Sequence, residues 1–163
     1  MDNLVRPCLL DSPTVVVAHS LGSVIIYRLL RKVEKKAEVP LLVTLGSPLG
    51  ICTIKEHLSP PSLAFPAAVN AWLNATDEKD CVAFHSRLDH DTFIDGIENV
   101  VSVKHSKDNP HDICDYLGNR TVAKRIHTAL TRAAVVTRPG RAGAVHVSAA
   151  SARIYAPPRK TPG

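Results

Sequence analysis

The stretch that decides the fold is Thr14–Leu30, which reads Thr-Val-Val-Val-Ala-His-Ser-Leu-Gly-Ser-Val-Ile-Ile-Tyr-Arg-Leu-Leu. Its β-branched run, Val15 to Val17, is typical of a strand that is buried on both faces. Apolar residues then recur with the spacing of one helix face, at Ile25, Leu29, Leu30 and Val33. The sequence therefore predicts a buried strand that turns sharply into an amphipathic helix.

The turn between this strand and this helix has the composition Ala18-His19-Ser20-Leu21-Gly22. A reversal this sharp accommodates only small residues two positions before and two positions after its apex, and Ala18 and Gly22 meet that demand. Ser20 is then presented at the carboxyl end of the strand, where the N–H groups of the following helix can stabilise an anion. The alternative is a turn serine that only caps the helix.

This pentapeptide resembles the nucleophile elbow of the α/β-hydrolase superfamily, in its lipase and esterase branches, with Ala18 in place of the commoner first glycine. The resemblance covers about residues 14–133. It implies that Ser20 is the nucleophile of a serine hydrolase and that the backbone N–H of Leu21 donates to the oxyanion.

The same resemblance implies an acid and a histidine that follow the serine in that order along the chain. Asp77 and Asp80 come just after a predicted strand, and the match favours Asp80 as the acid and Asp77 as a loop residue. His111, ahead of Tyr116-Leu117, resembles the histidine loop before the last helix, and we prefer it to His105 as the base.

His19, inside the elbow, is expected to pack rather than to act as the base, because its position beside Ser20 directs it away from the nucleophile. The expected catalytic set is therefore Ser20, Asp80 and His111.

The remaining apolar runs complete the predicted fold. We expect further strands at 41–45, 69–75 and 100–103, helices at about 22–36 and 119–133, and irregular chain at 51–66. Residues 1–13 read either as the end of a helix or as an exposed lead-in. The prediction is an α/β protein with a partial α/β-hydrolase fold: a mostly parallel sheet of about four strands with flanking helices over residues 1–133. Residues 134–163 are expected to be a disordered basic tail.

The net charge of +5 comes from this tail. From residue 131 onward the chain has six basic residues and no acidic one, which leaves 14 of the 20 basic residues and all 15 acidic residues in the first 130. The tail charges are sparse, and Tyr155 is the single aromatic residue among them. We therefore do not expect specific nucleic-acid binding.

Other features set expectations about cofactors and cellular location. The four widely spaced cysteines include no C-x-x-C pair, which favours reduced thiols over disulfides or zinc. The His and Asp residues within 84–97 match no metal-ligand spacing, so we expect a solvated loop and neither a metal nor a cofactor. No stretch is long and apolar enough to span a membrane, and no signal peptide is seen, so the expected location is the cytoplasm.

One departure from the superfamily leaves two hypotheses open. The superfamily's sheet has strands before the elbow, one of which leads into the loop that supplies a second oxyanion donor, and residues 1–13 hold neither. Loss of one such donor costs roughly 10²–10³ in rate, and an uncovered edge strand invites association with another chain. The chain is thus either a serine hydrolase of small-molecule or lipid esters, or a non-catalytic fragment or pseudoenzyme remnant.

Overall fold

The structure, a computed structural model, describes residues 2–33, 37–59, 62–101, 103 and 109–136. Four parallel strands form one sheet in the order β1-β2-β3-β4. The strands are β1 (Val16–His19), β2 (Leu42–Leu45), β3 (Trp72–Ala75) and β4 (Ile97–Val100). The helices are α1 (Asp2–Asp11), α2 (Leu21–Leu30), the 3-10 helix η1 (Pro48–Gly50), α3 (Cys52–Leu58), α4 (Ile113–Gly118) and α5 (Arg120–Val136). The predicted α/β architecture with a four-stranded parallel sheet is confirmed.

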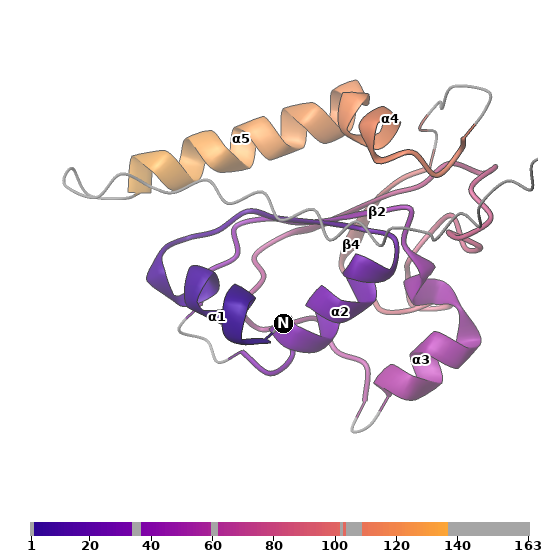
Figure 1. The fold of residues 1–163 in the computed structure, drawn as a ribbon, viewed down its shortest axis with the longest axis horizontal. Helices are drawn as coiled ribbons and strands as arrows, with labels where there is room; N and C mark the ends of the chain where they lie inside the picture. Colours follow the sequence, from indigo (N-terminus) through magenta and orange to yellow (C-terminus); the bar gives the residue numbers. More distant parts are fainter. Residues whose placement is uncertain (1, 34–36, 60–61, 102, 104–108, 137–163) are drawn as a thin grey trace, which may run out of the picture.

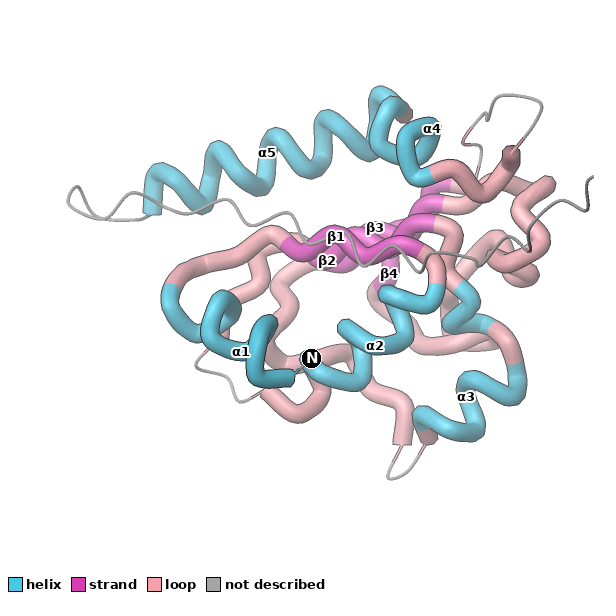
Figure 2. The backbone as a smooth tube through the Cα atoms, viewed as in Figure 1, coloured by secondary structure: helices cyan, strands magenta, loops and turns pink. Residues whose placement is uncertain are grey.

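The helices cover both faces of the sheet. Figure 1 shows α4 and α5 on one face and α1, α2 and α3 on the other, and Figure 2 shows the sheet between these two layers. Successive strand residues point to opposite faces: Leu42 and Trp72 pack in the core with α1 and α2, whereas Val43 and Leu73 pack in the core with Tyr116 and α5. Apolar layers on both faces explain why β2 and β3 are unbroken buried runs.

The structure corrects the end of the helix that was predicted at about 22–36. The expected helix extended to about residue 36, but α2 ends at Leu30, and residues 34–36 lie outside the described part of the chain. The N–H groups of Lys32 and Val33 bond to carbonyl groups three residues back, which tightens the last turn. Val33 is then buried in the α1–α2 core.

The last strand was predicted three residues too late. β4 spans Ile97–Val100, and Ile97 lies opposite Trp72. The prediction followed the apolar residues and missed this strand because its two central residues, Glu98 and Asn99, are polar. The Asn99 amide oxygen accepts hydrogen bonds from the Asn74 side chain at 3.1 Å and from the Leu88 N–H at 2.9 Å.

Three further expectations are resolved by the helices. Residues 1–13 hold α1, which decides between the two readings of that segment. The segment 51–66 contains α3 and is therefore not wholly irregular, and α4 was not predicted. The last helix was expected to end at residue 133 and extends to Val136, while residues 137–163 of the predicted tail lie outside the described part.

Candidate functional site

The loops after β1, β2 and β3 leave the sheet on the same side, at the carboxyl ends of the strands. This follows from the register, in which the last residues of the three strands are paired, His19 with Leu45 and Leu45 with Ala75. Ser20 and Gly46 directly follow β1 and β2, and Asp80 lies in the loop after β3. Carboxyl ends of parallel strands are where open α/β sheets place their ligand sites.

The backbone at Ser20 is strained. Its φ of 55° and ψ of −134° make it the single non-glycine residue with positive φ in the described part of the chain. A conformation of this kind costs roughly 1–3 kcal/mol and persists only where neighbouring groups hold it. The Ser20 N–H donates to the Leu45 carbonyl at 2.9 Å. Ser20 is the N-cap residue of α2, but its side chain makes no capping hydrogen bond to the helix.

Two buried serines hold the other side of the elbow. The Ser23 hydroxyl donates to the Ser20 carbonyl at 2.6 Å and lies 2.7 Å from the Ser47 hydroxyl. The Ser47 oxygen also accepts the N–H of Leu49 at 3.3 Å. Both hydroxyls are fully enclosed, so this chain of hydrogen bonds links the elbow to the loop after β2 without water access.

Asp80 is the buried acid of the site. Its Oδ2 accepts hydrogen bonds from His111 Nδ1 and from the Tyr116 hydroxyl, each at 2.7 Å, and its Oδ1 accepts the N–H of Val82 at 2.9 Å. Burial raises the pKa of the Asp80 carboxyl, but these three hydrogen bonds outweigh burial and leave the pKa below its ordinary value. Asp80 is therefore an ionised carboxylate at neutral pH.

His111 presents one ring nitrogen to this acid. An ionised carboxylate only accepts hydrogen bonds, so Nδ1 of His111 carries the proton in the 2.7 Å contact with Asp80. In the neutral ring, Nε2 is then the free base. Asn109 accepts the backbone N–H of His111 through its side-chain oxygen at 3.2 Å. The pair has the tautomer that a general base requires.

His19 connects the elbow to the His111 loop. Its Nε2 donates to the backbone carbonyl of His111 at 3.0 Å, and the two rings lie 4.4 Å apart between centroids. Burial, followed by the proximity of the His111 ring, lowers the pKa of His19. His19 therefore packs as a neutral ring against the ring of His111.

Gly46 allows the acid and the base to approach β2. Its φ is +53°, and a Cβ at this position would lie 2.6 Å from Asp80 Oδ2 and 3.0 Å from the His111 ring. No side chain fits there. Nothing in the sequence singles out Gly46, because the local sequence does not indicate which loops meet at this position.

The remaining predicted residues have these positions. Leu21 is the first residue of α2, so its N–H lies at the positive end of the helix dipole. Asp77 accepts the N–H of Lys79 at 2.7 Å and closes the turn before Asp80. His105 lies outside the described residues. Within the described residues, the structure joins Asp80 to His111 but forms no hydrogen bond between the Ser20 hydroxyl and His111.

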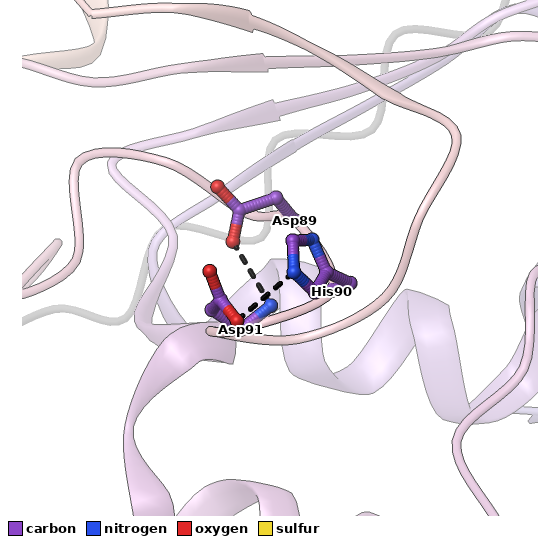
Figure 3. Close-up of side chains that lie close together, drawn as sticks. All are labelled: Asp89, His90 and Asp91. Carbon is purple, nitrogen blue, oxygen red and sulfur yellow. Dashed lines mark hydrogen bonds and ion pairs between the residues drawn. The ribbon is translucent and has the colours of Figure 1, made fainter.

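A second cluster of titratable side chains lies in the loop before β4 (Figure 3). Potential ligand atoms of Asp89, His90 and Asp91 lie within 4.8 Å of one another. His90 Nε2 contacts the Asp91 carboxylate at 3.0 Å, and both side chains are largely exposed. An oxygen of Asp89 accepts the backbone N–H groups of Asp91 and Thr92 at 3.2 Å each, which accounts for the turn without an ion.

Comparison with family models, curated proteins and solved structures yields no match to this chain. In the described part of the chain, no helix combines the length and the apolar character that crossing a membrane requires.

Proposed function

We propose that this protein is a serine hydrolase of carboxylic esters, with Ser20 as nucleophile, His111 as base, Asp80 as acid and the N–H of Leu21 as oxyanion donor. The observation that carries the proposal is the hydrogen bond between the buried Asp80 and the partly buried His111, at the same sheet edge as a serine with strained backbone. Acyl transfer of this kind needs a serine at the start of a helix and an imidazole that a carboxylate holds in one tautomer.

The chemistry assigns one role to each group. His111 Nε2 takes the proton of Ser20 as its Oγ forms a bond to the ester carbonyl carbon, and the Leu21 N–H stabilises the oxyanion. The carbon–oxygen bond to the alcohol then breaks, and the imidazolium returns the proton to the departing alkoxide. Water, deprotonated by the same nitrogen, then attacks the acyl carbon; the bond to Ser20 Oγ breaks, the imidazolium returns the proton to Oγ, and the carboxylic acid leaves. Asp80 stays ionised and stabilises the imidazolium throughout.

The first test is covalent labelling with a fluorophosphonate probe, followed by hydrolysis of short p-nitrophenyl esters. Ser20→Ala should abolish labelling, whereas Ser59→Ala, a serine at the end of α3, should leave it unchanged. Ser20→Ala and His111→Ala should each remove most of the hydrolysis, and the double variant should be little worse, because the residues act as a unit. Asp80→Asn should cost about 10⁴-fold.

Hydrolysis should rise with pH as the His111 imidazole loses its proton, since only the neutral ring accepts a proton from Ser20. Hydrolysis that persists unchanged in Ser20→Ala would exclude the proposed set of residues.

One observation favours a second candidate, a non-catalytic interaction module. β1 is the first strand in the order of the described sheet and pairs there only with β2, so its other edge is open to a further strand. This candidate predicts no Ser20-dependent hydrolysis at any pH.

A further inference from the structure

Tyr116 lies directly beneath the acid–base pair. It is the buried residue of α4 and is completely enclosed in the core between the sheet and α5. Its hydroxyl donates to Asp80 Oδ2 at 2.7 Å and accepts the backbone N–H of Asp77 at 3.2 Å. The Tyr116 hydroxyl therefore bridges two residues of the loop after β3, Asp77 and Asp80.

The Tyr116 hydroxyl and the His111 ring donate hydrogen bonds to the same acceptor atom, Asp80 Oδ2. Asp80 Oδ2 accepts from both at the same distance, 2.7 Å, while the other carboxylate oxygen is bound by the N–H of Val82. Burial, together with the hydrogen bond to the negative Asp80, raises the pKa of Tyr116. The phenol is therefore neutral and remains a donor over the working pH range.

We propose that Tyr116 is a positioning residue for the Asp80–His111 pair. Its hydroxyl fixes the orientation of Oδ2 toward His111 Nδ1 and divides the negative charge of that oxygen between two donors. The catalytic meaning of this role rests on the proposed function, whereas the effect on the His111 ring depends only on the contacts described.

The groups around His111 limit what else can move its titration. In the described part of the chain, its ring faces the Asp80 carboxylate and the ring of His19, and the carboxylate of Asp112 follows it in the chain. Tyr116→Phe leaves all three in place and removes one hydroxyl. The variant loses the two hydrogen bonds of this hydroxyl, of which the one to Asp80 Oδ2 lies next to His111.

The test is an NMR pH titration of the His111 ring in wild type and in Tyr116→Phe, with the resonance assigned by its loss in His111→Gln. Without the phenol, Oδ2 directs more negative charge at the imidazolium. The midpoint should therefore move up by less than about 0.7 in pH, since a hydrogen bond contributes about 1 kcal/mol and only the difference in its strength between the two protonation states of His111 counts. The acid limb of the pH–rate profile should move by the same amount, with KM unchanged.

Tyr27→Phe is the matched control. Tyr27 is equally buried, and its hydroxyl bonds to the backbone carbonyl and N–H of Ala64 at 3.0 and 3.1 Å, on the other side of the sheet. This variant should lose stability as Tyr116→Phe does and leave the titration of His111 at the wild-type midpoint. An unchanged midpoint in Tyr116→Phe would reduce Tyr116 to a purely structural residue and overturn the proposal.

A second variant covers the case in which Tyr116→Phe does not fold. Replacing the three tyrosines of the chain by 3-fluorotyrosine retains every hydroxyl but makes each a stronger donor. The midpoint of His111 should then move down, and no movement would again contradict the proposal. Because the titration needs no substrate, a protein without esterase activity that still shows these shifts would disprove the proposed function and leave the positioning role standing.

Discussion

At the scale of single residues, the contact between Asp80 and His111 depends on a glycine, Gly46. Gly46 has positive φ, and the space that its Cβ would occupy is filled by Asp80 Oδ2 and the His111 ring. The acid and the base therefore contact each other directly above the end of β2. Glycine is therefore required here for its lack of a side chain.

We expect Gly46→Ala to disrupt the acid–base pair and to cost about 1–3 kcal/mol of unfolding free energy, from backbone strain and from the 2.6 Å clash. Urea denaturation and ester hydrolysis measure the two effects. Gly118→Ala is the control, since a Cβ at Gly118 meets nothing within 4 Å. Equal behaviour of the two variants would show that the packing above Gly46 is unimportant.

At the scale of elements, the junction of β1 and α2 is held by α2 itself. Ser23, in the first turn of the helix, reaches back to the Ser20 carbonyl and contacts Ser47 after β2. The strained conformation at Ser20 is therefore supported by a helix and by a neighbouring strand, and its cost is offset by buried hydrogen bonds.

Ser23→Ala should leave the buried hydroxyl of Ser47 with one partner fewer and cost about 1–3 kcal/mol. It should also lower fluorophosphonate labelling of Ser20, because the elbow loses one of its supports. Ser59→Ala removes a hydroxyl-to-carbonyl bond of similar length, 2.7 Å to Lys55, at the end of α3, and should affect neither quantity to this extent. Wild-type labelling in Ser23→Ala would show that the elbow holds its shape without this bond.

At the scale of the whole molecule, the site makes stability depend on pH. The pKa of His19 is lowered below its ordinary 6.5 by burial and by the His111 ring, against the opposing effects of its hydrogen bond to the His111 carbonyl and of the charges of Asp80 and Asp112. In the window below 6.5 the unfolded chain binds the proton more readily, so stability falls as pH falls. Asp80 acts in the same direction at lower pH, since its stabilising charge is lost as pH falls below 3.8 through its lowered pKa.

Thermal unfolding between pH 7.5 and 5 measures the first of these effects. In His19→Asn the melting temperature should fall less over this interval than in wild type, because the variant has no ring at this position to protonate. The same fall in both proteins would show that His19 does not contribute to acid destabilisation.

The amino-acid sequence by itself determined the features that are local. The valine run, the small residues around Ser20 and the apolar spacing after them specify a strand, a turn and a helix, because each requirement is met within a few residues. The buried runs of β2 and β3 follow from the same reasoning, since both of their faces are covered. The parallel sheet could thus be predicted, whereas β4 was misplaced because partners far along the chain satisfy the polar groups of Asn99.

Only the tertiary structure decided which distant groups meet. Asp80 and His111 were candidates from a resemblance, but their contact depends on two loops 31 residues apart that converge at one sheet edge. The roles of Tyr116, Gly46 and Ser23 carry no local signal: a buried tyrosine, a turn glycine and a helical serine occur in most proteins. They contribute to the site through the fold, which brings the two hydroxyls, and the space left open at Gly46, into contact with Asp80, His111 and the turn at Ser20.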